Sequence, residues 1–419
     1  MNSKAPSLIV SYSRLAGAAA LSSAALGLSL PAQAQYTQTN LVSNIPGLAT
    51  LTEPRLVNPW GLARTGTSPF WTSNQGTSSS TLFAITGSTT VSEVFGINAN
   101  GFVAIPTTVG GPQGPTGQVS NTNTASFQLT PGDTSTSSRF LFANLNGTLS
   151  GWAGGLTSTI EATTTGAIYT GLAINTAGTR LYAADSAGGH INVFDSTFAP
   201  VSLPGAFADP NVPATFVPFN VQDIAGKVYV TYAPAGLPAQ RAATPGMGAV
   251  SVFDENGVLQ QTLINGSQLA APWAVAVFDT AGNFIRTLIS DGQLASPWGL
   301  ALAPAGFGSF GGDLLVGNFS FASSVINAFD PLTGAFAGSI PIDVGAGNTP
   351  GGLWALMFGS GAGNGGDANT LYFLDGINGE TAGLFGAVAA VPEPEIVALL
   401  GVGLAAIGWR RRRSESARA

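Results

Sequence analysis

The chain contains no cysteine and a single histidine, His190, and these absences remove several classes of site. Without cysteine there is no disulfide framework, thiolate nucleophile, iron–sulfur cluster or cysteine-ligated zinc. One imidazole cannot supply the histidines that most catalytic zinc sites require. A serine–histidine–aspartate triad would have to pass through His190. Because His190 follows two glycines in an expected turn, we interpret it as a solvated turn residue.

Charged residues are also scarce, at 8% of the 419 residues, against about 25% in an average soluble protein. Between residues 35 and 391 the sequence has 18 acidic and 7 basic residues. Nucleic-acid-binding proteins need a basic surface that neutralises phosphates. The negative charge of this segment therefore predicts that nucleic acid is not a partner.

The first 34 residues have the pattern of a secretory signal peptide. Two basic residues precede an apolar run over 15–30, and the small-residue motif Ala32-Gln33-Ala34 follows it. The alternative is a membrane anchor, but sixteen helical residues span only about 24 Å, which is short for a bilayer core. We therefore expect export across the inner membrane and a mature chain that begins at Gln35.

The other end of the sequence combines a Pro-Glu-Pro motif, an apolar run over 396–409 and an arginine cluster. The residues of the motif and the cluster are Pro392, Glu393, Pro394, Arg410, Arg411, Arg412 and Arg413. A short apolar helix followed by arginines stops in a membrane with its basic end in the cytoplasm. The run would span only about 21 Å, which is again short for a permanent span.

This arrangement resembles the PEP-CTERM sorting signal, which marks proteins of Gram-negative cells for an exosortase. The resemblance implies that 391–413 form the sorting signal, that 396–409 anchor the chain transiently in the inner membrane, and that 414–419 are a cytoplasmic tail. It also implies an exosortase-type processing protease as a partner, and a final location at the cell surface or in the extracellular matrix. Glu395 and the SESARA extension depart from the usual pattern and leave the cleavage position open.

Residues 35–390 consist of short alternating apolar runs separated by Gly, Asn, Ser, Thr and Pro, which is typical of β-strands and turns. One pattern recurs: a small–Leu–small run, a run with Leu-Tyr or Leu-Phe, and a run that ends in Phe-Asp. Clear copies lie at 171–195 and 299–330. Six units of about 40 to 55 residues match the period of propeller blades. We therefore predict an all-β fold, a six-bladed β-propeller.

The predicted ring needs a closure. The last unit shows only three clear strands, and a lone strand, Thr39–Val42, precedes the first unit. Antiparallel pairing of this strand with Gly383–Val388 would hide two open sheet edges. We therefore expect the N-terminal strand to become the outer strand of blade six.

The same body resembles an uncharacterised family of secreted bacterial proteins with NHL-like propellers, many of which carry PEP-CTERM signals. The matching stretches are LVNPWGLA at 56–63, GLAINTAGTRLYAADS at 171–186, FDSTFAPV at 194–201, GAFADPNVPATFVPFNVQDIAGKVYVTYA at 205–233 and SPWGLALAPAGFGSFGGDLLVGNF at 296–319. The resemblance implies a fold and no catalytic residue. One departure is a tandem duplication, because residues 249–273 and 274–298 align without a gap. A copy of that length is too short for a blade and predicts one hairpin.

Four tryptophans are the best candidates for ligand binding. Trp60, Trp273 and Trp298 each follow a proline just before an expected inner strand, and Trp354 begins another. Such links lie on one face of a propeller near its central channel, where indoles could stack on sugar rings. The alternative is that they wedge between blades.

Three aspartates are candidates for a different site. If a Ca²⁺ ion is bound at the channel mouth, then Asp185, Asp223 and Asp375 are its best ligands, and the protein would be a propeller lactonase or hydrolase. Their convergence near the axis would favour the enzyme, whereas separate positions at peripheral turns would disfavour it. The leading expectation is a non-enzymatic binding or scaffold module without a cofactor, which presents a rigid face to exopolysaccharide of the surface matrix.

Overall fold

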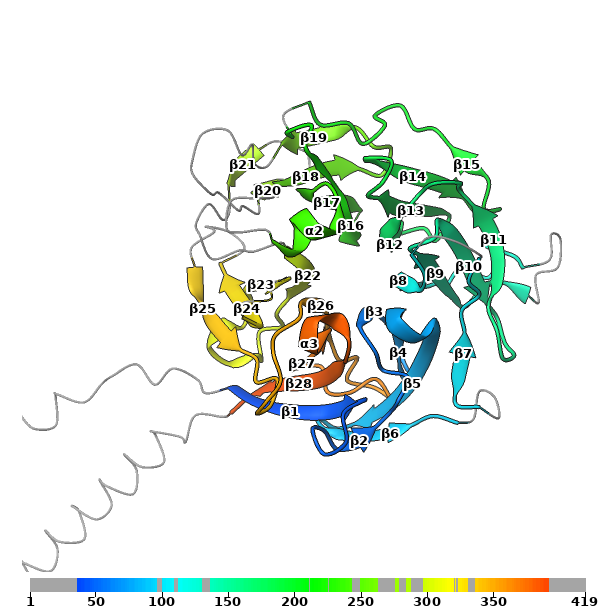
Figure 1. Ribbon diagram of the computed structural model, residues 1–419. Coiled ribbons are helices and arrows are strands. Elements are labelled where there is room, and N and C mark those ends of the chain that lie inside the picture. The colour runs from blue at the N-terminus through cyan, green and yellow to red at the C-terminus, as the bar shows by residue number, and fades with distance from the viewer. Residues whose placement is uncertain are drawn as a thin grey trace, which may run out of the picture. The chain divides into compact units, whose positions relative to one another are not determined.

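A computed structural model describes residues 36–95, 100–108, 112–129, 136–210, 212–224, 226–242, 249–262, 276–278, 284–287, 297–319, 321, 323–330 and 336–391. These residues form a ring of six sheets, around which the chain passes in order (Figure 1). Pairing within them is antiparallel except between β1 (Tyr36–Ser43) and β2 (Leu51–Thr52). The predicted six-bladed β-propeller is confirmed. The alternation of apolar and polar residues explains the strands, and the Gly-rich and Asn-rich segments between them explain the tight turns.

Blades two and three each contain four strands in chain order from the axis outward, and blade one contains a fifth beside these. Blade one has β3 (Pro59–Ala63), β4 (Phe70–Asn74), β5 (Ser79–Thr86) and β6 (Thr90–Glu93), with β7 (Phe102–Ala104) also paired to β5. Blade two has β8 (Pro115–Ser120), β9 (Phe140–Asn144), β10 (Thr148–Trp152) and β11 (Thr159–Thr163). Blade three has β12 (Tyr169–Ile174), β13 (Arg180–Asp185), β14 (His190–Asp195) and β15 (Pro200–Val201).

The next two blades repeat this plan. Blade four has β16 (Phe216–Ile224), β17 (Lys227–Pro234), β18 (Ala249–Asp254) and β19 (Leu259–Thr262). Blade five has β22 (Pro297–Leu302), β23 (Leu314–Asn318), β24 (Val325–Phe329) and β25 (Phe336–Pro341). In the ranges described here, short helical turns between strands are η1 (Gln75–Thr77), α2 (Leu237–Arg241), η3 (Gly308–Phe310) and α3 (Ile377–Glu380).

Blade six closes the ring with strands from both ends of the described chain. From the axis outward, its first three strands are β26 (Leu353–Phe358), β27 (Thr370–Asp375) and β28 (Leu384–Ala390). The next strand is β1 (Tyr36–Ser43), which pairs with β28, and the outermost is β2 (Leu51–Thr52), which pairs with β1. The pairing of β1 with β28 is antiparallel, with Thr39 opposite Ala387 and Val42 opposite Phe385. Figure 1 shows β1 in blue beside β28 in red. The predicted closure by the N-terminal strand is therefore confirmed.

Each inner strand carries an irregularity near its start. In all six blades the pairing register between the first and second strands shifts near the start of the first strand. Glycines at the bulge allow close approach to the next blade: a Cβ atom on Gly61 would lie 2.5 Å from the backbone oxygen of Thr116, and one on Gly299 would meet the backbone oxygen of Trp354. These bulges let six inner strands crowd around one axis.

The hydrophobic core lies between neighbouring blades. The cluster between blades three and four, for example, joins Tyr182 and Ile191 to Val221, Val230 and Phe253, all of them buried. Each sheet is thus covered on both faces by its neighbours, which leaves little surface for charged side chains. The low charge of the sequence follows from this arrangement.

The duplicated segment makes the same hairpin twice. In the first copy β18 and β19 complete blade four, with Ser251 opposite Thr262. In the second copy β20 (Ala276–Phe278) and β21 (Phe284–Thr287) form a two-stranded sheet of their own, with Ala276 opposite Thr287 and a register shift at the same place. The second copy therefore adds a hairpin and not a seventh blade.

None of the helices in the part of the chain that the structure describes is long and apolar enough to cross a membrane. The predicted signal peptide, the apolar run at 396–409 and Trp273 lie outside the described residues.

Candidate functional site

Three of the four predicted tryptophans meet on the axis of the ring. Trp60 stacks on Trp354 with ring centroids 3.8 Å apart, and Trp298 packs edge-on against both, at 6.4 Å and 5.7 Å. Phe219 and Phe319 contact the same group. The three indoles are 0–6% exposed. The tryptophans thus form a buried layer, as the wedging interpretation describes, and we call Trp60, Trp298 and Trp354 the tryptophan layer.

Two of the indole nitrogens link different blades, six to one and five to three. Trp354 Nε1 donates to Asn58 Oδ1 at 3.1 Å, and Trp298 Nε1 donates to the backbone oxygen of Thr170 at 3.3 Å. Trp60 Nε1 is buried and has no hydrogen-bond partner. An unpaired buried donor is costly, so a ligand or water that reached this atom would gain a hydrogen bond.

A cavity of about 530 Å³ lies on the face of the ring where the inner strands begin, which we call the entry face. The turns between second and third strands lie on the same face because the strands are antiparallel. Five blades contribute lining residues: Asn58, Trp60, Gln75, Pro112, Gln113, Leu145, Ile168, Thr170, Ser186, Ala187, Ala235, Gly236, Leu237, Gln240, Arg241 and Glu380. We call it the entry-face cavity.

A hydrogen-bond network ties its polar lining to the tryptophan layer. Asn58 accepts from Trp354 and donates through Nδ2 to Gln75 Oε1 at 2.8 Å and to Glu380 Oε1 at 3.4 Å. Gln75 Nε2 in turn donates to the backbone oxygen of Gln113 at 2.7 Å. These bonds fix the orientation of the amide groups before any ligand arrives.

Glu380 and Arg241 form an ion pair in the cavity wall. Arg241 Nε donates to Glu380 Oε2 at 2.9 Å. The Glu380 side chain is 5% exposed and the Arg241 side chain 41%. Burial raises the pKa of Glu380, while hydrogen bonds and charge from Arg241 act in the opposite direction. Glu380 also has a φ of 68°, a conformation that favours glycine, so the fold holds this carboxylate at a local cost of about 1–3 kcal/mol.

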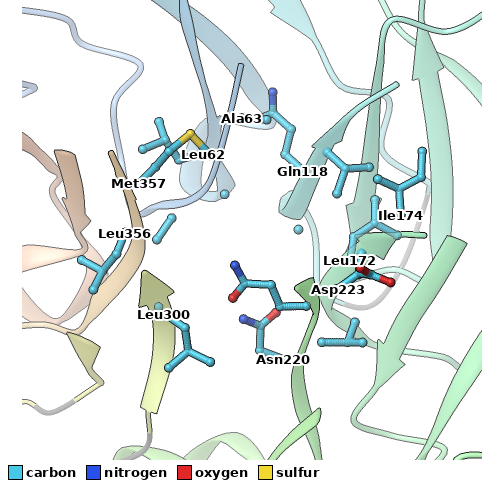
Figure 2. A pocket seen from close by; sticks show the side chains of 18 of the residues that line it. Leu62, Ala63, Gln118, Leu172, Ile174, Asn220, Asp223, Leu300, Leu356 and Met357 are labelled. Carbon is cyan, nitrogen blue, oxygen red and sulfur yellow. The ribbon is translucent and has the colours of Figure 1, made fainter. Parts of the chain in front are cut away.

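A second, smaller cavity of about 240 Å³ occupies the axial channel on the other side of the tryptophan layer. Figure 2 shows that each inner strand contributes a side chain to it: Leu62, Gln118, Leu172, Asn220, Leu300 and Leu356. Asn220 Nδ2 donates to the backbone oxygen of Trp298 at 3.0 Å, and Gln118 Oε1 accepts from Ser73 at 2.8 Å. These polar side chains thus link blades to one another.

The three predicted calcium ligands lie in three different blades and have different surroundings. Asp185 accepts hydrogen bonds from the backbone nitrogens of Ile168, Ala187 and Gly188 at 2.9–3.1 Å. This carboxylate therefore shapes the loops that supply Ile168, Ser186 and Ala187 to the entry-face cavity.

Asp223 lies at the far end of the axial channel, where its Oδ1 accepts from the backbone nitrogen of Gly226 at 3.1 Å. Burial raises its pKa to about 6. Asp375 is fully buried, and neither of its oxygens has a partner at hydrogen-bond geometry. Burial raises its pKa to about 6, against a smaller opposing effect of the Ser324 hydroxyl. Within the described ranges, no three His, Cys, Asp or Glu residues lie close enough to hold a metal ion. The structure thus gives no support to a calcium site made by these three aspartates.

Sequence reasoning missed most of the residues that line the entry-face cavity, although a signal for some of them exists. Gln75, Leu145, Ser186 and Ala235 each follow directly on the last residue of a second strand. Alignment of the second strands of the blades places these positions on the entry face. Arg241 and Glu380 come from loops of different length, and no repeat pattern marks them.

Comparison with known proteins identifies the C-terminal segment. Residues 390–413 match the model of the PEP-CTERM protein-sorting motif. The chain carries a PEP-CTERM sorting signal. Such a motif indicates export and a destination at the cell surface or outside the cell, and the expectation for residues 391–413 is confirmed to this extent.

The body is similar to proteins without a known activity. Uncharacterized protein R648 of Acanthamoeba polyphaga mimivirus is 29% identical over 245 residues, which are 56% of this chain and 58% of that protein. Uncharacterized protein L690 of the same virus is 27% identical over 58% of this chain and 64% of its own length. The chain thus spans less than two thirds of each of these relatives.

Solved structures resemble the fold at low identity. A Bacteroides thetaiotaomicron protein of unknown function is 13% identical with a TM-score of 0.48, covering 84% of this chain and 76% of its own. Kuenenia stuttgartiensis hydrazine synthase is 12% identical with a TM-score of 0.42, covering 78% and 76%. Likeness at this level carries no argument about activity.

Proposed function

We propose that the protein is a cell-surface binding module of the exopolysaccharide matrix, delivered by an exosortase. In this proposal the signal peptide directs export, the run at 396–409 holds the chain transiently in the inner membrane, and the protease removes the tail after Pro392-Glu393-Pro394 has been recognised. The sorting signal supports the destination. The ring then acts outside the cell without a catalytic step.

The observation that carries the binding role is the entry-face cavity. It is the larger of the two axial cavities described above, it is rimmed by loops of five blades, and its amide groups are already oriented by hydrogen bonds. A cavity with a few fixed polar groups is the usual form of a ligand site. The calcium-dependent hydrolase is the weaker alternative, since its three aspartates lie in separate environments.

Retention in the matrix tests the proposal. Protein released from the surface of cells that express the full chain should bind again to cell-free matrix polysaccharide, and chelation of divalent cations should leave this binding unchanged. Loss of binding on chelation, or release of soluble sugar products, would favour the calcium-dependent enzyme. A full chain with Pro392→Ala and Glu393→Ala should accumulate unprocessed, which tests the sorting step separately.

A further inference from the structure

We propose that the entry-face cavity binds the end of an uncharged polysaccharide chain. This inference rests on the proposed matrix-binding function and narrows it to one site, one class of ligand and one mode of binding.

The cavity is closed at its base. In the first blade Asn58 and Trp60 line the entry-face cavity, whereas Gly61 and the residues after it line the axial channel. Blade three shows the same division, with Thr170 on one side and Leu172 on the other. The buried tryptophan layer lies at this division. A polysaccharide therefore cannot thread through the ring.

The walls of the cavity favour entry from one direction. Lining residues come from blades one, two, three, four and six, so that walls surround the site on several sides. Its volume of about 530 Å³ lies within the usual range of about 300–1,000 Å³ for small-molecule sites. A terminal sugar unit fits a site with a floor and several walls, whereas an internal unit would need an exit for the chain on both sides.

The chemistry of the lining selects uncharged, hydroxyl-rich ligands. Its polar groups are mostly amides and hydroxyls, from Asn58, Gln75, Gln113, Thr170, Ser186 and Gln240. These groups donate and accept hydrogen bonds, as sugar hydroxyls do. Trp60 Nε1 adds a buried donor without a partner near the floor. Sugar hydroxyls can pair with such groups without bringing a charge out of water.

The charges of the cavity disfavour an anionic sugar. Arg241 and Glu380 are the charged residues of the lining, and they already neutralise each other. A uronic-acid carboxylate would lie near the carboxylate of Glu380 without a free cation to compensate it. The negative charge of residues 35–391 adds a long-range repulsion. Binding should therefore discriminate against acidic chains.

The first experiment compares chain ends with chain mass. Matrix polysaccharide is treated with a protease, partially hydrolysed with mild acid and separated into neutral and anionic fractions, and binding of the full chain to each is measured. At equal sugar mass, binding to the neutral fraction should rise in proportion to the number of chain ends. Binding that follows mass regardless of length, or that resides in the anionic fraction, would overturn the inference. Loss of binding after protease treatment would point to a protein partner.

A matched pair of substitutions locates the site. Ala187 lines the cavity in an exposed turn, and its backbone nitrogen donates to Asp185. Ala199 lies in an exposed turn at the other end of the same blade, and its backbone nitrogen donates to Asp195. Ala187→Trp should fill the cavity and weaken binding at least about tenfold, or about 1.4 kcal/mol. Ala199→Trp should leave binding unchanged.

The outcomes separate this inference from the proposed function. If both variants bind polysaccharide like the unmodified chain, the ring is a matrix-binding module that uses another surface, and the cavity assignment fails. If the unmodified chain binds no polysaccharide fraction, the proposed function itself fails. Circular dichroism of both variants shows whether the fold is intact, since each substitution adds bulk at an exposed turn without removing a hydrogen-bonding group.

Discussion

Asp185 and Asp375 occupy the same position in blades three and six, the last residue of the second strand. The Asp185 carboxylate accepts hydrogen bonds from three backbone nitrogens, whereas the Asp375 carboxylate is buried without a partner. Identical side chains at identical repeat positions therefore have opposite environments. The following loops differ as well: the backbone nitrogen of Asn378, three residues after Asp375, donates to the backbone oxygen of Thr349, whereas that of Gly188 donates to Asp185.

The environment of Asp375 predicts a pH dependence of stability. Its pKa is raised to about 6 in the fold, whereas an aspartate in the unfolded chain titrates near about 3.9. Between these values the unfolded chain loses its proton first, so the free energy of unfolding should fall as pH rises from 4 to 6, by at most about 3 kcal/mol. Thermal melting across this range should show the decline.

Asp375→Asn removes the titrating group, so the variant should lose less stability than the unmodified chain as the pH rises through this range. Asp343→Asn removes an exposed aspartate in a turn and serves as the matched control. An Asp375→Asn variant with the original pH profile would show that other carboxyl groups are responsible.

At the scale of elements, one position recurs through the ring. The second strand ends in Asn74, Asn144, Asp185, Asn318 and Asp375 in five blades, and in Pro234 in blade four. The five Asn and Asp residues are buried. Each stands where the chain leaves the sheet and turns on the entry face. Asp185 accepts hydrogen bonds from its turn, whereas Asn74 Oδ1 accepts from Thr72 within its own strand and Asn144 Oδ1 has no partner.

The duplicated hairpin predicts that one copy is expendable. Deletion of residues 274–298 removes β20 and β21, which pair with each other and not with a blade. The deletion also removes Pro297 and Trp298, the first two residues of β22, and Pro272-Trp273 takes their place before Gly299. We expect the fold to persist, with a change of about 1 kcal/mol and a few degrees in melting temperature. An insoluble product would show that the second hairpin is part of the core.

At the scale of the whole molecule, closure of the ring couples residues that are far apart in the sequence. Thr37 lies opposite Ala389 in the β1–β28 pair, and both are at least partly exposed. Without this pairing β28 would present an open edge. The stability of the ring therefore depends on a short strand at its N-terminal end.

A cross-link across this seam should stabilise the ring. Thr37→Cys with Ala389→Cys places two cysteines in a chain that has no others, so only one disulfide can form within a molecule. Such bridges contribute about 2–4 kcal/mol by restricting the unfolded chain. The oxidised variant should melt several degrees higher than its reduced form, and Thr37→Cys alone should show no such difference. An oxidised form no more stable than the reduced one would mean that the seam does not limit unfolding.

The sorting tail should be dispensable for folding. The last strand that the structure describes ends at Ala390, and Pro392 and Pro394 cannot donate to a strand ladder. A chain that ends at Val391 should keep the β-rich circular dichroism and melting temperature of the full chain. A loss of that spectrum would show that the tail belongs to the core.

Local patterns in the sequence were sufficient for the blades, the closure and the sorting signal. Strand alternation, the Phe-Asp endings and the Pro-Glu-Pro motif each depend on neighbouring residues, and a repeat displays them several times. Asp195 and Asp254, for instance, accept from backbone nitrogens two and four residues later, as residues that begin tight turns do. Because the ring repeats one local unit, its architecture could be read without knowing any long-range contact.

The cavity and its chemistry depended on the tertiary structure. Arg241 and Glu380 are 139 residues apart and belong to loops of different length, and Trp60, Trp298 and Trp354 reach each other only because the ring brings all inner strands to one axis. The sequence predicted these tryptophans near the channel, but it left open whether they stack on a ligand or wedge between blades. Burial depends on the assembled ring, because the residues that cover a Pro-Trp link belong to other blades.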